Sequence, residues 1–216
     1  ADMRRKSIVS TAVATAALIA GSALLPSAAR AEPIPATGAF SFTTGPGILS
    51  TWAYNNLRVT TTLPTVSVSR NNGTQITSVF PVVAKEKTAN FTGGQIRITN
   101  TKTGDFINCL NPAVDVAVKV VDCVMADKTN KRVFAIAKIG STKTLNSVYT
   151  TTNSYTGLDL KILDQATADW MNTKLKTNTF SPSVVFATGE LTAKLSLKRH
   201  VISQQYAAEI AALFTK

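Results

Sequence analysis

Residues that could carry out catalysis are scarce in this chain. His200 is the only histidine, so a Ser-His-Asp triad or a Cys-His pair would have to use it. The sequence contains no Gly-x-Ser-x-Gly elbow, no phosphate-binding glycine loop and no EF-hand loop. Hydrolysis by a pair of carboxylates would need two acidic residues in defined positions, but the spacing of the acidic residues does not single out a pair. The candidates are Asp105, Asp115, Asp122, Asp159, Asp164, Asp169 and Glu190. We therefore predict a non-enzymatic protein with no catalytic residues.

The two cysteines, Cys109 and Cys123, are the next candidates for chemistry. An even cysteine count in an exported protein favours a disulfide. Metal binding is the competing interpretation, but the sequence contains no Cys-x-x-Cys pair and only one histidine to serve as further ligands. We predict a disulfide and no metal site. The bridge would close a loop of about 15 residues, which is worth roughly 3 kcal/mol.

Large aromatic side chains are the remaining candidates for ligand contact. Trp52, Tyr54, Trp170 and Tyr206 are the most suitable of these, although large aromatics mostly pack in cores or at edges. Trp52 and Tyr54 lie close together in one short segment, so we take them as the candidate ligand-binding residues.

The first 31 residues have the layout of a secretory signal. A basic head at Arg4–Lys6 precedes an uncharged apolar run over Ile8–Leu25, and Ala29 and Ala31 frame a cleavage site. We expect removal of residues 1–31 and a mature protein that is secreted or held at the cell surface. Arg4-Arg5 leaves both the general and the twin-arginine export routes open. No segment after residue 31 is apolar enough to span a bilayer as a helix.

The chain is basic, with a formal net charge of +11. Such a surface attracts anionic partners, including wall polymers and lipid head groups. The lysines are scattered, however, and no nucleic-acid recognition motif appears. We therefore predict no nucleic-acid partner.

Alternating apolar residues indicate β-strands over most of residues 32–198. Asn72-Gly73 is a strong hairpin signal between two such runs. Val114, Val116, Val118 and Val120 predict one continuous strand with a bulge near Val121. The polar segment 140–157 reads as loop or edge structure. The fold class is mainly β, an antiparallel sandwich or twisted sheet.

Three segments have helical patterns. Residues 49–56 suit a turn or two, and Asp164 is a good N-cap for a short helix over 165–176. Residues 199–216 predict a C-terminal amphipathic helix, either docked on the sheet or facing a partner subunit or membrane surface. Its apolar face comprises the partner-binding candidates Ile202, Tyr206, Ile210 and Phe214.

Several short motifs follow one another in a characteristic order. They are Val79–Val83, Thr92–Ile98, Leu158–Leu160, Ala166–Asn172, Phe180–Ser183 and Ala187–Leu191. This order resembles exported actinobacterial β-proteins of the HtaA-like cell-surface type, and the match covers roughly residues 40–195.

This resemblance implies haem binding at the cell surface through an axial tyrosine with a histidine close by. Tyr54 is the nearest positional candidate for that tyrosine. The family's Trp-Gly pair and Ser-Phe-Arg stretch are absent, and His200 falls outside the matched block.

Together these observations predict a non-enzymatic secreted or cell-surface protein with a structural, assembly or binding role. Its expected partner is another copy of itself or a cell-envelope component, and no cofactor is required. The alternative is capture of haem or another hydrophobic ligand. The second alternative is hydrolysis of an envelope polymer.

Overall fold

The computed structural model describes residues 33–196. The expected signal peptide 1–31 and C-terminal helix 199–216 lie outside the described residues, as do His200, Ile202, Tyr206, Ile210 and Phe214. The described helices are α1 (Ile48–Tyr54) and α2 (Gln165–Leu175). The strands are β1 (Ile34–Thr44), β2 (Leu57–Thr62), β3 (Val66–Arg70), β4 (Gln75–Glu86), β5 (Ala89–Thr92), β6 (Gln95–Asn100), β7 (Phe106–Asp115), β8 (Val120–Val124), β9 (Asn130–Lys138), β10 (Ser141–Asn146), β11 (Thr150–Ile162) and β12 (Val185–Ser196).

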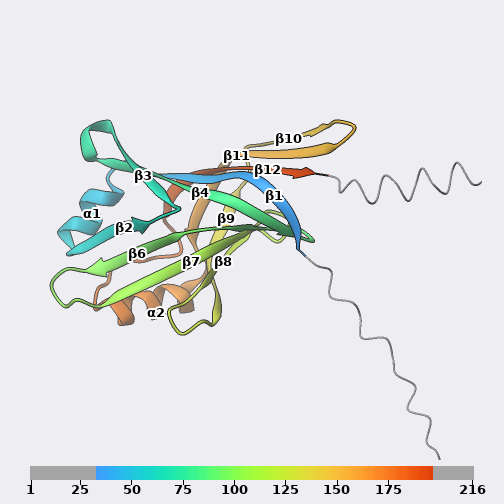
Figure 1. Ribbon diagram of the computed structural model, residues 1–216. Coiled ribbons are helices and arrows are strands. Elements are labelled where there is room, and N and C mark those ends of the chain that lie inside the picture. The colour runs from blue at the N-terminus through green and yellow to red at the C-terminus, as the bar shows by residue number, and fades with distance from the viewer. Residues whose placement is uncertain (1–32, 197–216) are drawn as a thin grey trace, which may run out of the picture. The chain divides into compact units, whose positions relative to one another are not determined.

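Eight of the strands form a closed antiparallel barrel (Figure 1). Neighbours follow the order β7-β5-β4-β1-β12-β11-β9-β8, and β8 pairs back onto β7 to close the ring. The other strands extend this ring: β6 and β2 continue from β7, β3 pairs with β4, and β10 pairs with β11. The predicted mainly β, antiparallel class is confirmed.

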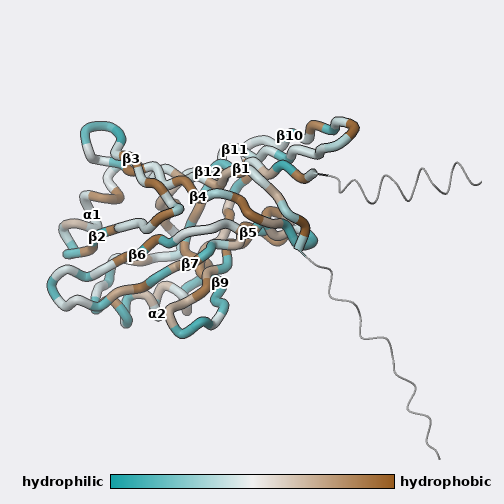
Figure 2. Tube along the Cα trace, viewed as in Figure 1, coloured by the Kyte–Doolittle hydropathy of each residue, from teal (hydrophilic) through white to brown (hydrophobic). Residues whose placement is uncertain are grey.

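Side chains alternate between the inside and the outside of the barrel. In β12, for example, Leu191 and Ala193 are fully buried while Thr192 and Lys194 are exposed. Hydrophobic colour runs through the strands and hydrophilic colour gathers at most turns, whereas the tip of the β10–β11 hairpin carries hydrophobic colour (Figure 2). This period of two places one apolar face of every ring strand against a common core.

The predicted disulfide is confirmed and lies at the strand pair that closes the ring. Cys109 belongs to β7 and Cys123 to β8, and both are almost fully buried. The bridge therefore links covalently the two strands whose pairing turns an open sheet into a barrel.

Local signals in the sequence predicted several turns and helix ends correctly. β3 and β4 form the expected hairpin, with Asn71 and Asn72 at positive φ in its turn. The Asp164 side chain caps α2 by accepting a hydrogen bond of 2.8 Å from the Thr167 N–H. Neither helix of residues 33–196 has the length and apolar content needed to cross a membrane.

The prediction of one continuous strand over Val114–Val121 is wrong. β7 ends at Asp115 and β8 begins at Val120, with a turn between them. The Asp115 carboxylate accepts hydrogen bonds from the N–H groups of Ala117 and Val118, at 3.0 and 3.2 Å. This local bonding competes with strand extension and reverses the chain inside a perfect alternation of valines.

The polar segment 140–157 forms a hairpin of β10 and the first half of β11. β9 and β10 pair one after the other with β11, and the change occurs where Gly140 lies against Gly157. A Cβ on Gly140 would lie 3.0 Å from the Thr156 carbonyl oxygen, and Gly157 has φ +64°. Glycine is suited to both positions because the two backbones approach closely there. The hairpin continues beyond the point where β9 ends (Figure 1).

Candidate functional site

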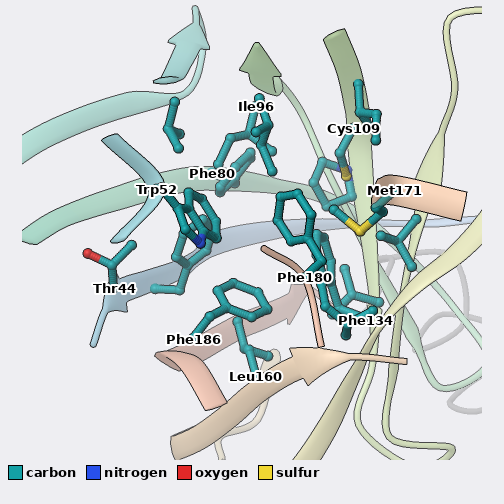
Figure 3. Close-up of a pocket in the computed structure, with 18 of the residues that line it drawn as sticks. Thr44, Trp52, Phe80, Ile96, Cys109, Phe134, Leu160, Met171, Phe180 and Phe186 are labelled. Atoms are coloured by element: carbon teal, nitrogen blue, oxygen red, sulfur yellow. The ribbon is translucent and has the colours of Figure 1, made fainter. Parts of the chain in front are cut away.

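The barrel interior is an aromatic core with little free space. Figure 3 shows Trp52, Phe80, Phe134, Phe180 and Phe186 gathered around it. Ring centroids lie 5.6 Å apart for Trp52–Phe180 and 5.3 Å apart for Phe134–Phe186. Aromatic pairs at such distances contribute about 0.5–1.5 kcal/mol each beyond the area they bury.

The remaining cavity in this core measures about 40 Å³. Sites for small organic molecules usually span about 300–1,000 Å³. A cavity of this size has room for no more than a few water molecules. The described interior is therefore packed core and does not fit a haem macrocycle.

The two ligand candidates from the sequence lie in different environments. Trp52 is buried against Phe180 and Phe186, whereas Tyr54, two residues later on α1, is 88% exposed. The short helix turns one side chain inward and the other outward. Trp52 thus serves the core, and Tyr54 alone is available to a partner in solution.

Three aspartates in residues 33–196 have a lowered pKa, and each is bonded to a turn or a helix end. Hydrogen bonds from the Thr103 hydroxyl and then Lys176 lower the pKa of Asp105. The Thr129 hydroxyl lowers the pKa of Asp127. The Thr167 N–H lowers the pKa of Asp164. These carboxylates are thus ionised acceptors at neutral pH, the opposite of what a general acid requires.

No group of three or more His, Cys, Asp or Glu within residues 33–196 is placed to hold a metal ion.

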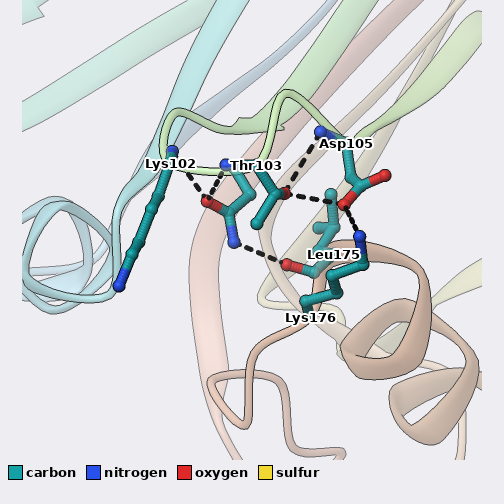
Figure 4. Close-up of polar contacts among 6 residues, drawn as sticks. Lys102, Thr103, Asp105, Leu175 and Lys176 are labelled. Carbon is teal, nitrogen blue, oxygen red and sulfur yellow. Dashed lines mark hydrogen bonds and ion pairs between the residues drawn. The ribbon is translucent and has the colours of Figure 1, made fainter.

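A buried amide fixes α2 to the turn between β6 and β7. The Asn100 side chain donates to the Leu175 carbonyl at 2.7 Å and accepts from the Lys102 N–H at 2.9 Å. Beside it, Lys176 pairs with Asp105 at 2.9 Å (Figure 4). This contact satisfies a carbonyl at the end of the helix, so its role is structural.

The β10–β11 hairpin carries exposed apolar side chains at its tip. Leu145, Val148 and Tyr149 are 55%, 74% and 65% exposed. Val148 and Tyr149 occupy the turn itself, where polar residues or glycine are usual. A turn that breaks this local rule on a well-paired hairpin is a candidate contact surface.

The body of the hairpin is held by its own side chains. The hydroxyls of Ser141 and Thr156 hydrogen-bond at 2.7 Å, and Thr144 donates to the Asn153 amide oxygen at 3.0 Å. Ser147 and Thr150 bond at 2.8 Å beside the turn. These cross-strand bonds keep β10 extended and present its outer edge in a fixed form.

The sequence interpretation did not identify this hairpin as a site. Its residues are mainly Thr, Ser and Asn, so the alternation of apolar side chains that indicates a half-buried strand is missing. The available signal was the placement of Val148-Tyr149 between two Thr-rich runs.

Comparison with known proteins finds no family model and no curated protein that matches this sequence. Among solved structures, the fold is similar to that of the haem-binding protein HtaB from Corynebacterium glutamicum. The TM-score is 0.41 and the identity 11%, over 76% of this chain and 95% of that chain. The C-terminal domain of HtaA from the same organism gives 0.41 and 11%, over 75% and 98%.

The weak HtaA-like resemblance predicted from the sequence is thus also found in the fold. Values this low describe a distant likeness of architecture and carry no inference about ligands.

Replacing each member of the Trp52/Tyr54 pair tests their different environments. Trp52→Ala should lower the free energy of unfolding by about 3–5 kcal/mol because it leaves a cavity in the aromatic core. Tyr54→Ala should change it by less than about 0.5 kcal/mol because the ring contacts mainly water. Urea unfolding followed by circular dichroism measures both. A cost for Tyr54→Ala comparable to that for Trp52→Ala would place Tyr54 in the core and contradict this assignment.

Proposed function

We propose that this protein is a non-enzymatic component of the cell surface or extracellular space that acts by assembling through its outer surface. The observation that carries the proposal is the β10–β11 hairpin, whose outer edge pairs with no strand of residues 33–196 and whose apolar tip is exposed. Exposed apolar groups gathered on one projecting element are typical of contact surfaces.

Two further features support this function. The packed interior directs binding to the outside, because its cavity is too small for an organic ligand. The buried Cys109–Cys123 disulfide suits an oxidising compartment, which agrees with the export signal expected at the N-terminus.

Light scattering of the purified protein over a wide range of concentration tests assembly. The apparent mass should rise above that of a monomer as concentration increases. Replacing Leu145, Val148 and Tyr149 together by serine should weaken association about tenfold or more, because the apolar contact area is lost. Tyr54→Ser is the control, since it removes an even more exposed ring elsewhere and should leave association unchanged. A monomer mass at every concentration would rule out the proposed function.

Haem binding is a second candidate, and one specific observation favours it. The Tyr54 phenol on α1 is exposed and free, and tyrosine is a known axial ligand of haem iron. Because the interior does not fit the macrocycle, Tyr54 would have to hold the iron at the outer surface beside α1. Bound haem would supply a redox-active iron and a planar apolar surface.

A haem titration followed by absorbance tests this candidate. Binding through Tyr54 predicts a Soret band that Tyr54→Phe abolishes, because the substitution removes only the phenolic oxygen. Tyr149→Phe is the control, because it makes the same change at an exposed tyrosine on the distant hairpin. An unchanged spectrum for Tyr54→Phe would exclude this tyrosine as the ligand.

A further inference from the structure

We propose that two copies of this protein join edge to edge through β10, antiparallel about a two-fold axis at Thr144. This inference rests on the assembly function above and specifies its partner and register. The observations that lead to it are the free edge of β10, the direction of its backbone groups and the placement of its one charge.

The outer edge of β10 has no partner strand within residues 33–196. Its six residues pair with β11 on one side only, from Ser141 opposite Thr156 to Asn146 opposite Thr151. All six are exposed. The strand contains no proline and only one charged residue, Lys143. Natural proteins usually protect such edges with proline, charges or bulges. Here Lys143 is the one charge within the strand, so it limits the registers in which the edge can pair but does not close the edge altogether.

Hydrogen bonds at both ends of β10 show which backbone groups point outward. The Ser147 N–H donates to the Thr150 carbonyl at 2.8 Å, and at the base the Gly140 N–H donates to the Thr156 carbonyl at 3.0 Å in a bulge. Bonded and non-bonded pairs alternate along an antiparallel ladder. Residues 141, 143 and 145 therefore bond inward to β11, and the N–H and C=O groups of Thr142, Thr144 and Asn146 face outward.

Three registers would let at least two outward residues of each copy bond to those of a second copy. In the first, Thr144 lies opposite Thr144 of the second copy and Thr142 lies opposite its Asn146. In the second, Lys143 lies opposite Lys143 of the second copy, and in the third, Leu145 lies opposite Leu145. Like charges directly opposite destabilise a sheet, so Lys143 disfavours the second register. The third register pairs only Thr144 and Asn146, whereas the first uses all three outward residues of β10 and therefore forms the most backbone hydrogen bonds.

The selected register also gives the apolar hairpin residues a partner. It places Leu145 opposite Lys143 of the second copy, whose aliphatic stem can cover the leucine while its ammonium group stays in water. It places Tyr149 at the level of Ile139, at the base of the second copy's β10. Ile139 packs against the edge of its own core and is partly exposed. Edge pairing and apolar contact thus occur together.

Single cysteines along β10 test this register directly. Thr144→Cys should form a disulfide-linked dimer under mild oxidation, because directly opposite residues in a sheet have Cα atoms about 5.5 Å apart, within disulfide range. Thr142→Cys and Asn146→Cys should each stay uncrosslinked alone and should crosslink when mixed. Cys109 and Cys123 are already bridged and almost fully buried, so they should not interfere.

Thr144→Pro supplies an independent measurement. It removes an outward N–H at the two-fold axis without removing a backbone bond to β11. The side-chain bond from Thr144 to Asn153 is also lost, but it is solvent-exposed and the backbone ladder stays intact, so circular dichroism should remain close to that of the wild type. The dimer should weaken about tenfold or more in light scattering. Lys143→Pro is the contrast, because it removes an inward bond and should disturb the hairpin itself.

The outcomes separate this inference from the function on which it rests. Strongest crosslinking at Thr144→Cys, together with weakened association of Thr144→Pro, supports the inference. Association of the wild type with strongest crosslinking at Lys143→Cys or Leu145→Cys, or with equal crosslinking at all positions, overturns this register and leaves the assembly function standing. A wild type that stays monomeric overturns both.

Discussion

The closure of the sheet between β7 and β8 is the constraint on which the rest of this structure depends. A ring of eight strands encloses a volume that side chains can fill, and here aromatic rings fill it. The Cys109–Cys123 bridge spans this junction and limits how far the two strands can separate when the chain unfolds. Once the ring is closed and packed, the interior can stabilise the fold but is too small for an organic ligand, which is why the proposed function uses the outer surface.

The ring also determines which strand edge and which apolar side chains are exposed on its outer surface. β9 leaves the ring at Lys138, and the Gly140–Gly157 contact lets the chain continue as β10 along β11. Because β8 pairs with β9 but not with β10, the outer edge of β10 has no partner in residues 33–196. The free edge is thus a consequence of strand lengths: β11 is longer than the part of it that β9 covers. The apolar tip lies at the end of this same extension, which is why edge and tip belong to one surface.

Signals within a few residues of each other predicted structure well in this chain. Asn72-Gly73, the Asp164 cap and the two cysteines each act through local geometry or compartment chemistry, and each is confirmed. The prediction from the valine run at 114–121 was wrong because the Asp115 carboxylate accepts hydrogen bonds from Ala117 and Val118, a local interaction that hydrophobic alternation does not reveal. The ring order depends on pairings between distant strands, such as β1 with β12, which no local pattern encodes. The burial of Trp52 and the exposure of Tyr54 could be distinguished only from the orientation of α1, which the sequence does not give.

Amide hydrogen exchange measured by NMR, with cross-strand NOEs, tests the closed and packed barrel most directly. The account predicts NOEs between β7 and β8, for example between Val114 and Val121, and slow exchange for the bonded amides of both strands. The outward amides of Thr142, Thr144 and Asn146 should exchange much faster in dilute protein. Fast exchange along β7 and β8 without NOEs between them would show an open sheet and contradict the account.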